Sequence, residues 1–209
     1  MILKKLKFKN SKKILKNRIL VSPMCQYSSV NGSPSNWHYR HLGNLIISGA
    51  SSIILESTAV SKEGMISKKD LCLQNKEQAF KFKKLVKFLK NLNNIPIGIQ
   101  ISHAGRKGSS ELPWFKFDTP LKKKYRWQTF SASKLKKDRG WPIPKQLTKR
   151  KIFKIINDFK KTAKKSDKAN FDLLEIHMAH GYLLHQFLSP ISNIRNDEYG
   201  GTREKRLKL

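Results

Sequence analysis

The sequence predicts an α/β fold in which short parallel strands alternate with longer helices. Two observations support this prediction: brief apolar segments rich in β-branched residues recur along the chain, and segments of helical period lie between them. The length of 209 residues suits one domain, and 38% hydrophobic with 10% aromatic residues can form a buried core. We therefore expect a globular protein.

The first two strand–helix units precede residue 93. A strand is expected at 18–24 and is followed by a helix at about 36–48. A second strand, at 51–59, precedes a helix at about 76–92. Apolar residues recur at near-helical spacing in this second helix, which gives it one apolar face. They are Phe80, Leu85, Phe88, Leu89 and Leu92.

Two further units follow. A third strand is expected at 95–102, with Pro96 near its start, where proline is tolerated. The segment 103–147 is too long for an ordinary strand–helix connection, so we expect it to be functional or mobile. Thr148 is a suitable N-cap for a helix that runs to about 168. A fourth strand is expected at 172–178, and 203–209 resembles the opening of another helix.

Four strands and three complete helices amount to half of a (β/α)₈ barrel, which has about 250 residues. We therefore expect an α/β barrel truncated after about four βα units, with residues 1–209 as the N-terminal half of a single domain. An open half-barrel leaves two strand edges and apolar surface uncovered. Such a half-barrel requires something that covers it.

The formal net charge of +30 is the most unusual feature of the composition. A charge of this size favours nucleic acid or another polyanion as a partner. However, the lysines are spread over the whole chain, and no RNA- or DNA-binding motif accompanies them. A solvated lysine-rich surface is the simpler interpretation, and a basic nucleic-acid-binding module stays as an alternative.

Cysteine content and apolar runs indicate the compartment. No apolar signal region precedes Cys25 and Cys72, so both are expected to be free thiols rather than a disulfide. The apolar runs are far shorter than the roughly 20 residues that span a bilayer. We therefore expect a cytoplasmic protein without a membrane segment.

Polar and titratable residues are concentrated where the four predicted strands end. In a parallel barrel the carboxyl ends of all strands lie on one face, where loops build the active site. The strands end in SPMCQY at 22–27, ESTAV at 56–60, QISHAGRK at 100–107 and EIHMAHGY at 175–182. The sequence therefore predicts a site formed by converging loops.

These segments resemble the bacterial NADPH dehydrogenase branch of the old yellow enzyme family, which has a TIM-barrel fold. The resemblance rests on SPMCQYS, W-H-x-x-H, ESTAV, GIQISHAGRKG and EIHMAHGYLLHQFLSPISNIRNDEYGG, in that order, over nearly the whole chain. Cys25 and His180 mark the branch. The resemblance implies an FMN-dependent ene-reductase. In such an enzyme NADPH reduces FMN, and hydride then passes to the activated double bond of an α,β-unsaturated carbonyl compound.

The resemblance also implies which residues contact the cofactor. Gln100 would bond the pyrimidine end of FMN, because an amide can both donate and accept there. Tyr27 would reach the substrate. Cys25 would tune the redox behaviour of the flavin, although a small buried core residue is the simpler alternative for a lone cysteine. The residues lining the flavin would be Ser22, Pro23, Met24, Cys25 and Ala59.

His177 and His180 are implied to bind substrate and to act in catalysis. Hydride addition builds negative charge on the carbonyl oxygen, and two imidazole donors would stabilise it. Tyr182 would be the catalytic proton donor. One alternative is a structural histidine pair bonded to backbone. A zinc site with His185 as third ligand is another, but cysteine ligands and a supporting carboxylate are missing, so no metal is expected.

Other residues near the motifs are expected to have supporting roles. His103, Arg106 and Lys107 would be adjacent to the site, and His38 and His41 with Trp37 would pack or cap the first helix. A loop below the site is expected around 185–187. Four positions depart from the family pattern without removing a catalytic group. They are Met65, where arginine is usual; Cys72 and Gln74, where glycine and tryptophan are usual; and Met178, where a small residue is usual.

The family supplies the rest of the flavin site from later strands, including an arginine near the flavin and the loops after strands seven and eight that grip the phosphate. We therefore expect the 209 residues alone to bind FMN poorly and to have little activity. The partner is expected to be either a second copy of the chain in a homo-oligomer or a partner chain that supplies the missing half-barrel. The alternatives are an inactive truncated gene product and one half of a split enzyme.

Overall fold

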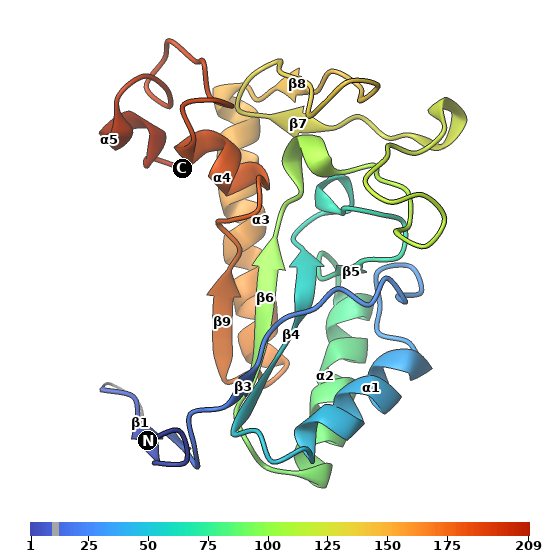
Figure 1. Cartoon of the computed structure of the whole chain (residues 1–209), viewed down its shortest axis with the longest axis vertical. Coiled ribbons are helices and arrows are strands. Elements are labelled where there is room, and N and C mark those ends of the chain that lie inside the picture. The colour runs from blue at the N-terminus through green and yellow to red at the C-terminus, as the bar shows by residue number, and fades with distance from the viewer. Residues whose placement is uncertain (10–12) are drawn as a thin grey trace.

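A parallel sheet forms the centre of the chain in the computed structural model, which describes residues 1–9 and 13–209 (Figure 1). The strand order is β3-β4-β6-β9, and each pairing on this path is parallel. β5 (Leu71–Cys72) pairs with the end of β4. The predicted α/β fold is therefore confirmed. The strands of the main path are β3 (Leu20–Val21), β4 (Ser52–Ala59), β6 (Ile97–Ser102) and β9 (Leu173–Ile176).

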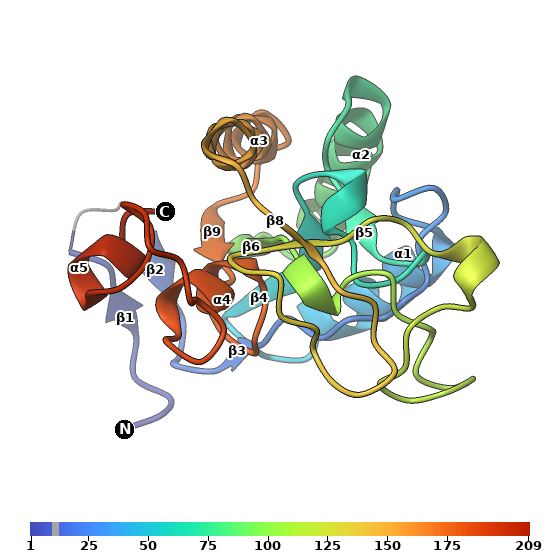
Figure 2. The same ribbon diagram turned by 90° about the horizontal axis from the view of Figure 1, so that it is seen from above.

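Three helices cover one face of the sheet (Figure 2). They are α1 (Asn36–Ile46), α2 (Lys76–Leu92) and α3 (Lys149–Lys168), and each connects two neighbouring parallel strands. Ile53 and Leu55 of β4 are fully buried in the core that these helices form with the sheet. Repeated β–α–β crossovers of this kind make half of a (β/α)₈ barrel.

The ends of α2 and α3 follow from their capping residues. Asn75 accepts from the backbone N–H of Gln78 at 2.8 Å, and the Gln78 side chain accepts from the N–H of Asn75 at 3.3 Å, which completes a capping box. The hydroxyl of Thr148 accepts from the N–H of Lys151 at 3.3 Å, so the predicted N-cap of α3 is confirmed.

The apolar face expected for α2 is partly wrong. Leu85 and Leu89 are buried as expected, but Phe82 and Val86 complete the buried face. Phe80 is 58% exposed, and Phe88, Leu92 are also exposed. The ring of Phe88 packs edge-on against Tyr39 of α1 at 5.2 Å, so it belongs to the contact between the two helices rather than to the sheet.

β4 contains an irregularity at the end that faces the loops. Leu55 pairs with Ile99, and Thr58 pairs with Ile101, so two residues of β4 lie opposite one residue of β6. This is a β-bulge, which re-aims side chains at a strand end. Glu56 and Ser57 are the two residues at this bulge, and both are buried.

The strands expected at 18–24 and 172–178 are too long. β3 contains only two residues, and β9 ends at Ile176. β3 and β9 are the outer strands of the path, so each has a neighbour on one side only. Pro23 also has no N–H with which to extend β3. The chain beyond each strand is therefore free to turn and carry side chains into the loops.

The two outer strands leave apolar side chains exposed. Leu174 and Ile176 are 44% and 49% exposed, although they pair in register with Ile99 and Ile101, which are buried beneath the helices. Leu20 of β3 is also exposed. The expectation that an open half-barrel exposes edges and apolar surface is therefore confirmed for the described residues.

The long segment 103–147 is ordered against the C-terminal part of the chain. Arg195 is 5% exposed and donates to the carbonyl oxygens of Ala132 at 2.9 Å and Leu147 at 2.8 Å. The segment contains short elements that have no counterpart in the expected pattern. They are η2 (Gly105–Lys107), η3 (Lys123–Tyr125), β7 (Phe130–Ser131) and β8 (Lys145–Gln146).

The loop expected around 185–187 is wrong, because α4 (Leu183–Leu188) forms there. Gln186 of α4 is 1% exposed and donates to the carbonyl oxygen of Gly181 at 2.6 Å. It also accepts from the Ser131 hydroxyl at 3.0 Å. The buried amide thus ties α4 to β7. The expected helix opening at 203 is confirmed as α5 (Arg203–Arg206).

The remaining short elements lie outside the main path. β1 (Leu6–Lys7) and β2 (Ile14–Leu15) pair antiparallel near the N-terminus, and η1 (Lys62–Gly64) follows β4. Within residues 1–9 and 13–209, no helix has the length and apolar character needed to cross a membrane.

Candidate active site

The predicted site residues lie at the carboxyl ends of the parallel strands. Figure 1 shows the arrowheads of β4, β6 and β9 pointing to the same end of the molecule, where the long loops and α4 lie. Ala59 ends β4, Gln100 lies within β6, and His177 directly follows β9. The segment 22–27 follows β3. The structure therefore brings the four motifs to one end of the sheet.

His177 is held by two backbone contacts. Its N–H donates to the carbonyl oxygen of Ile101 at 3.0 Å, and its Nδ1 accepts from the N–H of Ala179 at 3.2 Å. The second contact places the imidazole proton on Nε2. Burial lowers the pKa of His177, and the neighbouring His180 and Lys107 lower it further. The side chain is therefore a neutral imidazole that can donate through Nε2.

His180 and Tyr182 pack edge-on against His177. The ring centroids of the two histidines are 5.0 Å apart, and those of His177 and Tyr182 are 4.7 Å apart. We call these three side chains the ring cluster. His177 is buried, Tyr182 is half-buried and His180 is exposed. The two histidines therefore lie close together, with His180 open to solvent, and their convergence on one substrate oxygen stays a prediction.

A left-handed turn allows the ring cluster to form. His180 has φ of +54°, and Gly181 has φ of +70°. Such angles are rare for a non-glycine residue and require support from the surroundings. The ammonium group of Lys107 donates to the carbonyl oxygen of His180 at 2.9 Å and lies 5.1 Å from the centroid of the Tyr182 ring. Lys107, expected only to be adjacent to the site, thus holds its turn.

Tyr182 and Cys25 are both kept protonated. Burial raises the pKa of Tyr182, and the charged forms of Cys25 and Tyr27 would raise it further. Burial also raises the pKa of Cys25, and the carboxylates of Asp70 and Glu56 act in the same direction. Tyr182 can therefore donate a proton, and Cys25 presents a thiol rather than a thiolate.

Tyr27 lies beside Cys25. Burial raises the pKa of the Tyr27 phenol. The two side chains also interact electrostatically, so ionisation of Cys25 would raise the pKa of the Tyr27 phenol further. Its backbone is left-handed, with φ of +48°, and its ring meets Trp114 edge-on at 6.0 Å. Tyr27 is thus fixed both by its own turn and by the long segment that follows β6.

A buried carboxylate that the sequence analysis did not single out supports this loop. Glu56 is 5% exposed, accepts from the backbone N–H of Gln26 at 2.8 Å, and lies 3.1 Å from Nε2 of His38. Nδ1 of His38 accepts from the N–H of Ser35 at 3.0 Å, so Nε2 carries the proton toward Glu56. The expected capping role of His38 is confirmed. Glu56 was visible only as part of the ESTAV motif.

The remaining histidines lie outside the ring cluster. The His41 ring stacks on Trp37 at 6.1 Å, as expected for packing on α1. His103 is 1% exposed, and burial lowers its pKa to about 3. His185 accepts through Nδ1 from the N–H of Gly181 at 2.8 Å, which supports the turn before α4. Among the described residues, no group of three or more His, Cys, Asp and Glu side chains could hold a metal ion.

Three of the residues predicted to face a flavin ring offer a group to a ligand, whereas a fourth, Ala59, is buried among other side chains. Gln100 donates through Nε2 to Glu175 at 2.6 Å, which leaves its carbonyl oxygen as an acceptor for an imide N–H. Met24 is 51% exposed, and Ser22 is exposed beside it. Ala59, however, is only 2% exposed, because it packs in a small cluster with other side chains. That cluster contains Met65, Cys72 and Trp127.

The sequence matches one family over almost all of its length. The sequence pattern of the family described as "NADH:flavin oxidoreductase / NADH oxidase family" matches residues 2–209. An NADPH dehydrogenase of Clostridium acetobutylicum is 43% identical over 198 residues, which is 93% of this chain and 53% of the relative. An NADH:flavin oxidoreductase of Gibberella zeae is 42% identical over 197 residues, 92% of this chain and 48% of the relative.

Solved structures show the same fold. Morphinone reductase superimposes with a TM-score of 0.83 at 22% identity, over 98% of this chain and 55% of that one. An old yellow enzyme homologue from Zymomonas mobilis superimposes with a TM-score of 0.81 at 23% identity, over 98% and 56% of the two chains. The chain thus spans about half the length of the relatives that it matches, as expected for half of a (β/α)₈ barrel.

Proposed function

Because the chain belongs to the NADH:flavin oxidoreductase / NADH oxidase family, we propose that these residues form the N-terminal half of an FMN-dependent NADPH dehydrogenase of the ene-reductase type. Its substrate would be a small α,β-unsaturated carbonyl compound. The observation that carries the proposal is the ring cluster at the carboxyl end of β9, in which His177 and His180 lie 5.0 Å apart beside Tyr182. In this proposal residues 1–209 are half of a single FMN-binding barrel domain.

The two histidines would stabilise the charge that develops on the substrate. Nε2 of His177 carries a proton because the N–H of Ala179 occupies Nδ1. With His180 it would donate to the carbonyl oxygen, on which negative charge grows as hydride arrives at the double bond. A neutral imidazole can do this, because its Nε2–H donates a hydrogen bond to the developing anion without giving up the proton.

Tyr182 would supply the proton that completes the reduction. Burial keeps its phenol protonated at neutral pH, and its ring lies 4.7 Å from that of His177. A substrate oxygen held by His177 would therefore place a neighbouring carbon within reach of the Tyr182 hydroxyl. Tyr27, on the loop after β3, would contact the same substrate.

FMN, when bound, would supply the hydride that it receives from NADPH. Gln100 would hydrogen-bond the pyrimidine end of the flavin through its free carbonyl oxygen, and Ser22, Pro23, Met24 and Cys25 would line the flavin. Ala59 would contribute through its backbone, because its side chain is almost fully buried. The phosphate would be held by the second half of the barrel.

The second half-barrel would also cover the outer strands. Leu174 and Ile176 expose apolar side chains at the edge of β9, and β3 is the opposite edge. We propose that strands five to eight, on the same protein or on a partner chain, pair with these edges. If the chain is half of a split enzyme, added strands five to eight should restore flavin binding; if it is an inactive product, they should not.

Both thiols are free, which supports a cytoplasmic location.

A chimera tests this function directly. Residues 1–209 would be fused to the second half of the Clostridium acetobutylicum relative, and bound FMN and NADPH-dependent reduction of 2-cyclohexenone would be measured. We expect bound FMN and turnover. H177A/H180A should retain FMN and lose roughly 100-fold or more in kcat, and Y182F roughly 100-fold. The matched control H41A should behave as the parent chimera.

The outcome against the proposal is equally specific. A chimera that binds FMN but reduces the enone no faster than its H177A/H180A variant would refute the role of the ring cluster.

The basic nucleic-acid-binding alternative predicts instead that the 209-residue chain prefers one polynucleotide over others at constant salt. Uniform, salt-sensitive retention on all polyanions would reflect the charge of +30 alone.

A further inference from the structure

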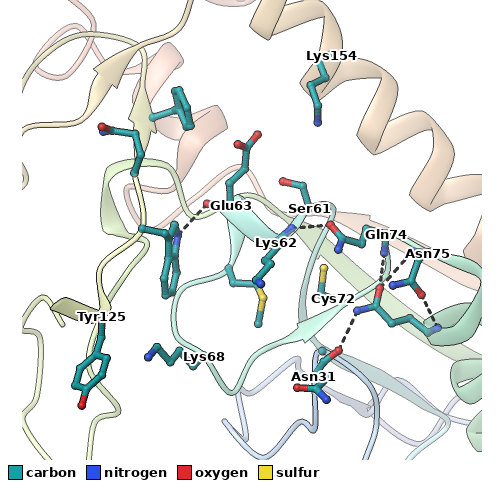
Figure 3. A pocket seen from close by; sticks show the side chains of 16 residues that line it. Asn31, Ser61, Lys62, Glu63, Lys68, Cys72, Gln74, Asn75, Tyr125 and Lys154 are labelled. Atoms are coloured by element: carbon teal, nitrogen blue, oxygen red, sulfur yellow. Dashed lines mark hydrogen bonds between the residues drawn. The ribbon is translucent and has the colours of Figure 1, made fainter. Parts of the chain in front are cut away.

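A cavity of about 1000 Å³ lies away from the ring cluster, where η1, the start of α2, α3 and the segment 125–130 meet (Figure 3). None of His177, His180 and Tyr182 lines it. A cavity of this size is large enough for a cofactor-sized or drug-sized molecule. We call it the outer pocket.

One wall of the outer pocket is aromatic. Tyr125, Trp127 and Phe130 follow one another from the last residue of η3 onward, and all line the cavity. The indole N–H of Trp127 donates to the carbonyl oxygen of Glu63 at 3.3 Å, which fixes the ring against η1. Cys72 is fully buried beneath the same cavity. A flat, immobilised indole beside an apolar floor is a surface on which a planar ring can stack.

Cationic side chains surround this wall. Lys62, Lys68 and Lys154 line the outer pocket, and Glu63 is the acidic residue among its lining. Glu63 is already paired with Lys151 at 2.8 Å. The ammonium group of Lys68 lies 4.4 Å from the centroid of the Tyr125 ring, so it sits directly at the aromatic wall. The excess of positive charge next to the rings favours an anion.

Two buried oxygen atoms at the pocket have no hydrogen-bond partner. They are the hydroxyl of Ser61, a residue that is 6% exposed, and Oε1 of Glu63. In Figure 3 the Glu63 side chain rises on the side of the pocket where Lys154 extends down from α3, and the Ser61 side chain lies below Lys154 and points toward Glu63. Buried polar atoms are nearly always bonded, so such atoms at a cavity indicate a missing partner. A hydrogen-bonding ligand would satisfy them.

We propose that the outer pocket binds a planar aromatic anion, with its ring against Trp127 and Tyr125, its anionic group at Lys62 and Lys68, and a polar edge bonded to Ser61. The three observations that carry the proposal are independent of one another: the aromatic wall, the cationic rim and the unpartnered hydroxyl. The proposal does not depend on the flavin chemistry of the ring cluster.

Adenosine 5′-monophosphate is a suitable probe, because it joins an aromatic ring to a dianion. Its binding to the 209-residue chain would be measured by isothermal titration calorimetry in 150 mM salt. Adenosine retains only the ring, and ribose 5-phosphate retains only the anion. We expect both fragments to bind roughly tenfold or more weakly than the probe. Equal binding of ribose 5-phosphate and the probe would mean attraction to charge alone and would overturn the proposal.

Matched variants locate the site. K62A/K68A should weaken the probe roughly tenfold or more, and S61A and Y125A should each weaken it measurably. K83A/K87A removes the same charge from the exposed face of α2 and should bind as the parent does. If K83A/K87A weakens binding as much as K62A/K68A, the proposal fails.

A further variant separates this site from the proposed active site. H177A/H180A should bind the probe as tightly as the parent chain, because those histidines do not line the outer pocket. Loss of probe binding in H177A/H180A, with K62A/K68A unaffected, would place the ligand at the strand ends instead and refute the outer pocket. Circular dichroism on each variant would confirm that its fold is retained.

Discussion

The backbone N–H of Ala179 donates to Nδ1 of His177 over 3.2 Å and thereby decides which nitrogen of that ring carries the proton. The acceptor position is used internally, so only the Nε2 donor remains for a ligand. Burial, helped by the neighbouring His180 and Lys107, lowers the pKa of the imidazole. A single backbone contact thus sets the hydrogen-bonding character of the group on which the proposed chemistry depends.

This contact predicts a specific tautomer. In a ¹⁵N NMR spectrum of the 209-residue chain at pH 7, His177 should show a protonated Nε2 and an unprotonated Nδ1. The ring of His180 makes no hydrogen bond within the described residues, so its two nitrogens should show averaged shifts. H177Q would assign the signal. A protonated Nδ1 on His177 would contradict the prediction.

The stability of the chain should depend on pH through two buried groups that oppose each other. Burial lowers the pKa of His103 to about 3 and raises that of Asp70 to about 7. Below its ordinary pKa of 6.5, His103 takes up a proton in the unfolded chain only, so stability is lost as the pH falls. Asp70 takes up a proton in the folded chain near pH 7, so it adds stability as the pH falls toward its ordinary value of 3.8.

Single variants should separate the two contributions. Between pH 6.5 and pH 5 the free energy of unfolding of H103Q should rise on acidification, and that of D70N should fall, each by up to about 1.4 kcal/mol per pH unit relative to the parent. Urea titrations followed by circular dichroism would measure the slopes. Slopes of the same sign in both variants would show that these groups do not titrate as proposed.

Removing the charge of Glu56 should destabilise the chain. E56Q would place an amide N–H₂ opposite a donor, because both carboxylate oxygens now accept, from Gln26 and from His38. We expect a loss of about 1–3 kcal/mol in the free energy of unfolding. The control is E77Q, since the Glu77 side chain is 73% exposed and pairs with Lys81 across a helix turn. A change in E77Q as large as in E56Q would refute the argument.

The exposed edge of β9 should make the isolated 209-residue chain self-associate. Sedimentation velocity should show mass rising with concentration, and L174K/I176K should shift the distribution toward monomer, because charged side chains block edge and apolar contacts. F153K replaces a side chain that is 62% exposed on α3 and should associate as the parent does. Equal loss of association in F153K would mean that general charge repulsion, rather than the β9 edge, is responsible.

Helices with local signals were predictable, and contacts between distant segments were not. The bounds of α2 and the cap of α3 follow from nearby residues, so periodicity and Thr148 were sufficient to place them. α4 is only six residues long and is held by Gln186 through partners up to 82 positions away. No local pattern of that length distinguishes such a helix from a loop.

In the candidate site, too, residues close together in the sequence were predictable and contacts between distant segments were not. His177, His180 and Tyr182 could be grouped from sequence because they lie within six positions at one strand end. The support from Lys107 could not be predicted, because it depends on the left-handed turn at His180 and on a contact across 73 positions. The outer pocket is formed by segments that are far apart in the sequence, so no local motif predicts it.

Because of the bulge in β4, substitution and deletion of a residue should have different effects on this strand. Substitutions at Glu56 or Ser57 alter one side chain each. Deletion of either residue would leave a single residue of β4 opposite Gln100, so the bulge would be lost while Thr58 and Ala59 could keep their partners Ile101 and Ser102. β4 should therefore tolerate loss of one codon at the bulge, with loss of one buried polar side chain, better than loss of a codon elsewhere in the strand, which would shift the register.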